Sequence, residues 1–379
     1  MLITNARIIT EHHIIPHGWL HISDHIIDAL GEGDAPDFDE NAYNAHGAIL
    51  APGFIDLHVH GAMGHELMDA NADGLRAMAK FYAQRGVTSF LPTTLTASHE
   101  QIVAALNTVK EVMPDSGGAT ILGAHLEGPY LNIEKCGAQR PEHIRVASVN
   151  EATELLDLGV IRLLAIAPEI AGNQWLITEC MRRGIAVSIA HTSATYEEAI
   201  AAFDMGITQS THTYNAMTPL HHRKPGVVGA ALSEPRVRCE IICDLQHVAA
   251  GAIRTLYFAK GNAGTMLITD SMSATGMPDG DYTLGAHHVT KRGDLVTLAD
   301  GTLAGSAATY DFCVRNFMQV TGKTFEDIWQ VTSLTPAQAI HQGHLRGSIA
   351  PGKIADLVLL DEKANVKMTV VGGKKVYEA

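Results

Sequence analysis

The hydrophobic residues between positions 52 and 343 follow two alternating patterns. Short apolar runs, typical of buried strands, are separated by longer segments with the spacing of amphipathic helices. Strands are expected at 55–58, 89–91, 122–126, 162–166, 186–189, 209–210, 240–243 and 266–268. Helices are expected at 72–85, 99–113, 149–158, 173–183, 196–205, 249–260, 310–321, 325–331 and 336–341. Eight strands alternating with helices predict a TIM-type (β/α)8 barrel of the α/β class.

Both ends of the chain contain short strand-like stretches separated by turn residues. Pro351-Gly352 is a typical turn pair, because proline fixes φ and glycine readily adopts a positive φ. Strands are expected at 8–9, 19–22, 26–27, 49–50, 347–349, 355–360 and 370–376. We predict that residues 1–51 and 344–379 form one small β-sandwich-like domain, and that residues 52–343 form the barrel.

Five potential metal ligands stand where apolar runs end, although the run before the last of them is weak: His58, His60, Glu127, His191 and His212. A barrel enzyme keeps its active site at the carboxyl ends of its strands. His58 and His60 are expected to point the same way, because side-chain direction in a strand repeats every second residue. Imidazole and carboxylate ligands suit zinc or a similar divalent ion. The pattern therefore predicts a hydrolytic metal site.

These residues also have ordinary structural interpretations. With 21 His in the chain, an HxH pair arises easily by chance and can be a surface or core pair. Glu127 favours a metal site, because buried acids are rare unless they are paired or bind a metal. Asp270 ends another apolar run, where a general base would stand to take a proton from the attacking water. Its alternative role is to cap a following helix.

The composition favours a cytoplasmic enzyme. The chain is 46% hydrophobic, yet it has no apolar run of about 18 residues that could span a membrane and no signal-peptide pattern at its start. Its five scattered Cys lack a CxxC pair, which indicates reduced thiols and argues against a disulfide framework or a thiolate zinc site. The net charge of −14 argues against nucleic acid or an anionic membrane as a partner.

An anionic substrate would need a local basic pocket in this acidic chain. The densest run of potentially cationic residues is His-His-Arg-Lys at 221–224. A solvated loop is the alternative interpretation of this run.

Motifs along the whole chain carry a family resemblance. They are PGFIDLHVHG at 52–61, HLEGPY at 125–130, HTYNAM at 212–217, HHRKPG at 221–226, LITDSM at 267–272, DGTLAGS at 300–306 and GSIAPGKIAD at 347–356. Together they resemble the N-acetylglucosamine-6-phosphate deacetylases of the amidohydrolase superfamily. HLEGP and HTYNAM are specific at these spacings, whereas HxH is shared across the superfamily. The resemblance implies metal-dependent hydrolysis of the acetamide of N-acetyl-D-glucosamine 6-phosphate to glucosamine 6-phosphate and acetate.

The resemblance also implies ligand roles. Glu127, His191 and His212 would hold the principal metal ion, and His58 and His60 would hold a second ion bridged by Glu127. The expected ion is zinc, with iron, cobalt or manganese as alternatives, and one or two ions per chain.

The resemblance further implies how the substrate is held and hydrolysed. Asp270 would act first as base and then as acid. The sugar phosphate would be received by Asn215, the backbone of Ala216, Arg223 and His247. In similar enzymes this Arg is thought to come from the neighbouring subunit, so we expect a homodimer. The partner would be a small phosphorylated amino sugar.

The chain departs from the family pattern at two places. Gln139 stands in the loop after HLEGP, where similar deacetylases often carry a His near the substrate, so the resemblance implies that Gln139 contacts the substrate. A Gln can donate a hydrogen bond but cannot be protonated. Leu245-Gln246 before His247 replaces a more usual Gly-containing approach.

Three alternatives to the glucosamine activity stay open. The galactosamine epimer is a close rival substrate. A cyclic-amide amidohydrolase such as a dihydroorotase is another, although those enzymes usually bridge their metals with a carboxylated Lys, and no Lys stands out at a strand end. A non-catalytic scaffold is the third, against which the retention of all five ligands and Asp270 argues.

Overall fold

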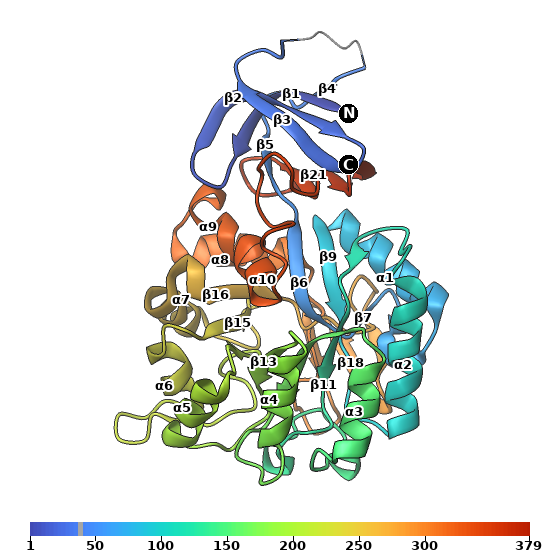
Figure 1. The fold of residues 1–379 in the computed structure, drawn as a ribbon, viewed down its shortest axis with the longest axis vertical. Helices are drawn as coiled ribbons and strands as arrows, with labels where there is room; N and C mark the ends of the chain where they lie inside the picture. The colour runs from blue at the N-terminus through green and yellow to red at the C-terminus, as the bar shows by residue number, and fades with distance from the viewer. Residues whose placement is uncertain (37–40) are drawn as a thin grey trace.

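The computed structural model describes residues 1–36 and 41–379. Figure 1 shows a sheet built from both ends of the chain, above a larger part in which helices surround parallel strands. The chain passes from β5 in the terminal sheet directly into β6, which runs away from that sheet (Figure 1). The carboxyl ends of β6 and of the strands parallel to it therefore lie on the side remote from the terminal sheet.

Strands from both ends of the chain share the terminal sheet. Its order is β22-β21-β20-β5-β1-β2-β3, with β4 paired to β1. The strands are β1 (Leu2–Ile9), β2 (Ile14–Ser23), β3 (Ile26–Glu32), β4 (Tyr43–Asn44), β5 (Ile49–Pro52), β20 (Leu357–Leu360), β21 (Val366–Val371) and β22 (Lys374–Glu378). The two halves meet where β5 pairs antiparallel with β20, with Leu50 opposite Leu359. Both leucines are buried in a core formed by this sheet.

Two predicted terminal strands differ from the structure. The strand expected at 370–376 is divided by a turn at Gly372-Gly373 into the end of β21 and the start of β22, because both glycines adopt a positive φ. Residues 347–349 form no strand. Gly347 adopts a positive φ of 85°. It packs closely against Ser333, the residue before the helix at 334–339, and against Ala337 within that helix. The chain therefore turns here to contact the helix, where an extended strand could not follow. The turn at Pro351-Gly352 is present, with Gly352 at a φ of 85°.

The larger part contains two parallel sheets. One has the order β10-β9-β6 and the other the order β11-β12-β13-β14-β15-β16. The strands are β6 (Phe54–Val59), β9 (Val87–Pro92), β10 (Thr120–Ile121), β11 (Ala124–Glu127), β12 (Ile161–Ile166), β13 (Ala186–Ile189), β14 (Gln209–Ser210), β15 (Arg238–Ile242) and β16 (Thr265–Ile268). Single parallel bridges join their edges, between Thr93 and His125 and between Val59 and Ser271. Most of these strands are buried along their whole length, which is why they read as unbroken apolar runs.

Helices follow the strands and cover their outer faces (Figure 1). They are α1 (Ala72–Gln84), α2 (His99–Val112), α3 (Val149–Asp157), α4 (Gln174–Arg182), α5 (Tyr196–Met205), α6 (Gly226–Ser233), α7 (Ala250–Gly264), α8 (Tyr310–Thr321), α9 (Phe325–Thr332) and α10 (Leu334–Ala339). Local sequence sets several starts, as in α5, where Thr195 and Glu198 form a capping box. Helix α10 begins two residues before Pro336, which the first turn tolerates because its N–H groups have no helical acceptor. Within 1–36 and 41–379, none of the helices combines the length and the apolar character needed to cross a membrane.

One helix and one small sheet of the larger part were not predicted. Helix α6 contains two glycines and is buried on nearly every side, so its sequence shows no amphipathic period. A small antiparallel sheet of β17 (Gly280–Leu284), β18 (His287–Arg292) and β19 (Leu295–Thr297) lies between β16 and α8. Its strands are short and largely exposed, which gives a weak sequence signal.

Candidate metal centre

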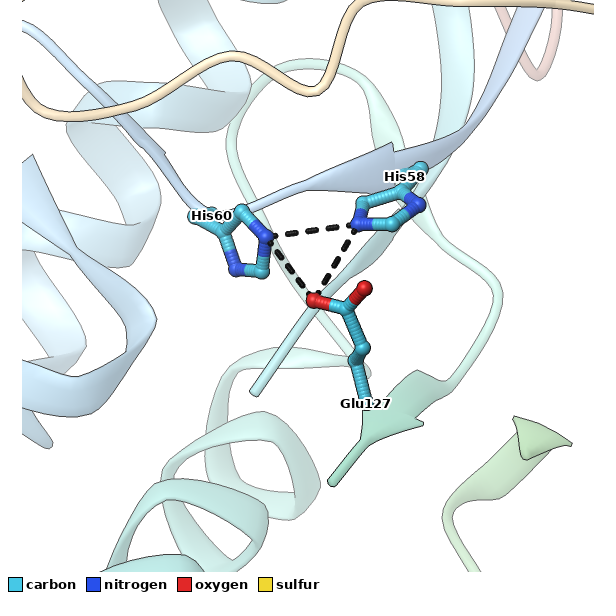
Figure 2. A group of neighbouring side chains, drawn as sticks. All are labelled: His58, His60 and Glu127. Atoms are coloured by element: carbon cyan, nitrogen blue, oxygen red, sulfur yellow. Dashed lines mark hydrogen bonds and ion pairs between the residues drawn. The ribbon is translucent and has the colours of Figure 1, made fainter. Parts of the chain in front are cut away.

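The predicted ligands come from the carboxyl ends of four parallel strands. His58 lies in β6 and His60 directly after it, and Glu127 is the last residue of β11. His191 and His212 each lie two residues beyond a strand, β13 and β14. Figure 2 shows the His58, His60 and Glu127 side chains converging on one point. Parallel pairing from β11 to β14 brings the other two histidines to the same edge.

Glu127 stands between two histidine pairs. Its Oε1 lies 3.2 Å from His191 Nε2 and 3.1 Å from His212 Nε2, and these two nitrogens are 3.2 Å apart. Its Oε2 lies 3.5 Å from His58 Nε2 and 3.3 Å from His60 Nε2, which are themselves 3.3 Å apart. Each carboxylate oxygen thus faces its own pair of imidazoles, and both groups of three side chains are fully buried.

The donor set fits a divalent metal ion. Four ligands at about 2.0–2.1 Å in a tetrahedron would lie about 3.3 Å from one another, close to the separations found around each oxygen of Glu127. The outer ring nitrogens also agree, because His191 Nδ1 lies 2.7 Å from the carbonyl of Lys135 and His60 Nδ1 lies 3.2 Å from that of Thr93. A carbonyl can only accept, so Nδ1 carries a proton, and with an ion bound Nε2 would offer its lone pair to that ion.

Asp270 joins the group facing His58 and His60. Its Oδ1 lies 3.2 Å from His60 Nε2 and 3.4 Å from His58 Nε2. Asp270, His191 and His212 have positive φ values of 52°, 42° and 29°. Such angles are unfavourable for residues with a Cβ, and they cluster at functional sites, where the surrounding structure holds them.

Electrostatics keeps the two carboxylates of the centre negative. Burial alone would raise the pKa of Glu127, but the charge of His58 and hydrogen bonds from His191 and His212 outweigh it, so the pKa lies well below its usual range. Burial likewise opposes ionisation of Asp270, and the charge of His58 with the hydrogen bond from His60 lowers its pKa. Burial would lower the pKa of His60, which Asp270 and Glu127 instead raise to about 9. Paired anionic oxygens beside basic imidazoles are suited to hold a cation.

A pocket of about 390 Å³ opens over this centre. His60, Glu127, His191, His212 and Asp270 form part of its lining. The rest includes Gln139, Asn215, Ala216 and His247 together with the apolar side chains Leu95, Leu284 and Leu303. A mostly apolar pocket with a few converging polar groups is the usual form of a small-molecule site.

Sequence and structural comparisons identify the family. The sequence model of the amidohydrolase family matches residues 49–376. An N-acetylgalactosamine-6-phosphate deacetylase of Escherichia coli O157:H7 is 37% identical over 97% of this chain and 97% of its own. An N-acetylglucosamine-6-phosphate deacetylase of Vibrio furnissii is 40% identical over 87% of this chain and 83% of its own. This chain belongs to the N-acetylglucosamine-6-phosphate deacetylase family of amidohydrolases.

A solved structure agrees with this membership. It is a mutant N-acetyl-D-glucosamine-6-phosphate deacetylase of Mycobacterium smegmatis, in complex with N-acetyl-D-glucosamine 6-phosphate. It matches with a TM-score of 0.93 and 32% identity, covering 99% of both chains. The amidohydrolase fold of this chain is therefore shown, and amidohydrolases depend on divalent metal ions.

One predicted residue of this amidohydrolase lies away from the others. Arg223 is exposed, in the turn of residues 221–224, and is not among the residues that line the pocket of its own chain. Its exposure outside that lining agrees with a role at a neighbouring subunit, which stays a prediction.

Sequence reasoning missed two buried carboxylates that face the imidazole rings of predicted site residues. Glu240, in the middle of β15, has its Oε2 3.4 Å from His58 Nδ1. Asp244 Oδ2 lies 2.6 Å from His247 Nδ1. The available signal was an acid inside or directly after the apolar run 239–243, a rare position unless the acid is paired.

Proposed function

We propose that this chain hydrolyses the acetamide of N-acetyl-D-glucosamine 6-phosphate to glucosamine 6-phosphate and acetate. The observation that carries the proposal is the place of Glu127 between two histidine pairs, with Asp270 facing the same pocket. The Vibrio furnissii relative bears the name of this activity, and the Mycobacterium smegmatis structure contains this substrate.

The proposed centre holds two divalent ions. Zinc is the metal that suits this ligand set best. His191 and His212 with Glu127 Oε1 would hold one ion, and His58 and His60 with Glu127 Oε2 the other. Neutral imidazoles with one carboxylate are typical zinc ligands, and iron, cobalt and manganese accept the same donors. When bound, the ions supply Lewis acidity that activates water and polarises the acetamide carbonyl.

Asp270 is the proposed proton-transfer group. An amide has a poor leaving group, so its nitrogen must gain a proton as the C–N bond breaks. The lowered pKa of Asp270 leaves its carboxylate free to accept the proton of the attacking water. The same carboxyl group would then deliver that proton to the departing nitrogen. The Asp270 backbone N–H donates a 2.9 Å hydrogen bond to the His58 carbonyl, which holds Asp270 beside the centre.

Three of the proposed substrate contacts line the pocket. Asn215, the backbone of Ala216 and His247 would receive the sugar phosphate. Arg223 of the neighbouring subunit in a homodimer would add a guanidinium, whose paired N–H groups match phosphate oxygens. The exposure of Arg223 and its absence from its own pocket support this arrangement.

Two finer features of the fold belong to the same proposal. We infer that the nine parallel strands, of which β10 and β11 follow each other without a helix and share one position, close into one eight-position barrel at residues 52–343, which the single bridges between the sheet edges support. Residues 1–51 and 344–379 would form the second domain, which the shared terminal sheet supports.

The decisive experiment measures acetate release from three compounds. N-acetylglucosamine 6-phosphate should react fastest, and unphosphorylated N-acetylglucosamine should react at least about tenfold more slowly because charge-assisted hydrogen bonds to phosphate are lost. Equal rates with and without phosphate would contradict the assigned phosphate site.

N-acetylgalactosamine 6-phosphate is the third compound. The Escherichia coli O157:H7 relative, which matches nearly the full length of both chains, is named for deacetylation of this epimer. A higher kcat/KM for this compound than for the glucosamine epimer would replace the proposed substrate while leaving the chemistry unchanged.

A further inference from the structure

Glu240 is a buried acid without an obvious structural need. It lies in the middle of β15, flanked by Cys239 and Ile241, and its exposed fraction is 0%. A carboxylate in such surroundings is costly unless hydrogen bonds compensate for lost hydration. Its Oε1 has no hydrogen-bond partner among the described residues, so all compensation in this structure comes through Oε2. An apolar residue would fill this strand position at lower cost, which points to a functional reason for the acid.

The contacts of Glu240 Oε2 lead to both histidine pairs. It lies 3.4 Å from His58 Nδ1 and accepts a hydrogen bond of 3.2 Å from the His212 backbone N–H. The Glu240 carbonyl accepts a second backbone hydrogen bond, of 2.9 Å, from Thr213. The His212 backbone has a φ of 29°, so these bonds hold a strained turn.

His58 presents its two ring nitrogens to different groups. Nδ1 faces Glu240, while Nε2 faces Glu127, His60 and Asp270 at 3.3–3.5 Å. A neutral imidazole carries one N–H, so donation from Nδ1 to Glu240 leaves the lone pair on Nε2. The His125 ring packs edge-on at 4.7 Å from the His58 ring, but neither of its nitrogens has a hydrogen-bond partner in the described ranges. His125 therefore limits the space around His58 without selecting its tautomer.

We propose that Glu240 is a positioning residue that makes His58 a metal ligand. Glu240 accepts a hydrogen bond from Nδ1–H of His58. This directs the Nε2 lone pair into the centre and increases the basicity of that nitrogen. His60 and His191 face backbone carbonyls instead, so His58 is distinguished from them by a carboxylate partner. The charge on Glu240 selectively strengthens the subsite of His58 and His60. This inference rests on the two-ion centre proposed above.

The test is a metal-binding measurement. Apo protein is titrated with Zn²⁺ and with Co²⁺, and the two dissociation constants and the stoichiometry are obtained by calorimetry and elemental analysis. Glu240→Gln keeps the shape of the side chain but removes its charge. It should weaken binding of the ion held by His58 and His60 by about tenfold to 100-fold, the range for loss of a residue that hydrogen-bonds a metal ligand. The dissociation constant of the other ion should change by less than about threefold, because the side-chain carbonyl of the introduced glutamine can still accept a hydrogen bond from the His212 backbone N–H. Glu240→Leu should weaken the same ion at least as much.

A double-mutant cycle with His58→Ala separates positioning from a general effect on folding. In the His58→Ala background the second subsite is already lost, so Glu240→Gln should change the affinity of the remaining ion by less than about threefold. Asp311→Asn is the matched control, because Asp311 is also a buried acid with one carboxylate oxygen that lacks a partner among the described residues, and its other oxygen accepts a hydrogen bond from Arg315. It should leave both dissociation constants unchanged. Thermal melting verifies that each variant is folded.

The outcomes are distinct. Unchanged affinities in both Glu240→Gln and Glu240→Leu would overturn the role of Glu240, as would a loss in Glu240→Gln that persists in the His58→Ala background. Wild-type protein that binds fewer than two ions would instead contradict the two-ion centre itself, and the role of Glu240 would fall with it.

Discussion

The side-chain amide of Gln139 donates a 2.8 Å hydrogen bond to Oε2 of Glu127, the oxygen that faces His58 and His60. The Thr96 backbone N–H donates a 2.7 Å hydrogen bond to the side-chain Oε1 of Gln139. This contact fixes the side-chain amide with its NH2 group toward Glu127. Gln139 is buried, and it also lines the pocket. The residue predicted from the family pattern as a substrate contact is therefore also a partner of the central carboxylate.

Replacement of Gln139 should affect metal affinity as well as catalysis. Gln139→Ala removes the donor to Glu127, so the affinity for the ion near His58 and His60 should fall by about tenfold, and kcat should fall with it. Gln139→His restores an N–H donor and should recover part of both. Calorimetric titration of the apo variants provides the measurement. A raised KM with unchanged metal affinity in Gln139→Ala would indicate that Gln139 acts only on the substrate.

Variants of Asp270 and Glu127 should distinguish a residue that transfers protons from one that binds the metal ions. Asp270→Asn keeps the size of the side chain but removes its basic carboxylate, so metal content should persist while kcat falls by about 10²-fold to 10⁴-fold. Glu127→Gln removes the charge that faces both histidine pairs, so it should empty the centre. Elemental analysis and acetate release on the same samples distinguish the two effects. Loss of metal from Asp270→Asn as complete as from Glu127→Gln would assign Asp270 to ligation instead.

The sequence was most informative where local pattern and position in the fold coincide. Each predicted ligand follows an apolar run, and parallel strands bring all such positions to one edge, so His191 and Glu127 could be placed together without knowledge of the contacts. Helix ends were predictable for the same local reason, as at Thr195, whose capping box with Glu198 is visible in the sequence.

The features that were missed depend on contacts between distant parts of the chain. Glu240 contacts His58, from which it is separated by 182 residues, and nothing near either residue in the sequence indicates this contact. Helix α6 lacks the amphipathic period because it is buried on nearly every side. Residues 347–349 have strand-like composition, but packing of Gly347 against Ser333 and Ala337 determines their path.

Arg223 supports a prediction about assembly. If Arg223 completes the pocket of a neighbouring subunit, a mixture of inactive Arg223→Ala and Asp270→Asn chains should regain activity through hybrid dimers with one intact site. Random exchange of equal amounts makes half of the dimers hybrids, so recovery should approach about a quarter of wild-type activity. Lys224→Ala, which removes the adjacent exposed cation, is the control and should keep near wild-type activity without a partner variant. Absence of recovery despite demonstrated subunit exchange would place Arg223 in its own pocket or outside the site.

The pair of Asp244 and His247 predicts how substrate binding depends on pH. Burial lowers the pKa of His247, but the hydrogen bond and charge of Asp244 outweigh it, so the pKa lies above the usual range of a histidine. A raised pKa means that His247 stays protonated to a higher pH, and its attraction for phosphate is lost as the pH rises through that value. Asp244→Asn removes the stabilising charge, so KM should begin to rise at a lower pH, by about tenfold at most for one charge-assisted hydrogen bond. The ionisation of the substrate phosphate affects both proteins equally and cancels in the comparison.

The measurement is KM and kcat for the 6-phosphate substrate between about pH 6 and pH 9, the range in which a perturbed histidine titrates. The pH dependence of kcat should change little, because the role proposed for His247 is to bind the phosphate end of the substrate and not the acetamide. Gln246→Ala, which alters an exposed neighbour, should leave the profile of KM unchanged. His247→Gln should flatten the profile, since an amide does not titrate in this range. Superimposable profiles of KM for wild-type protein and Asp244→Asn would show that protonation of His247 does not govern phosphate binding.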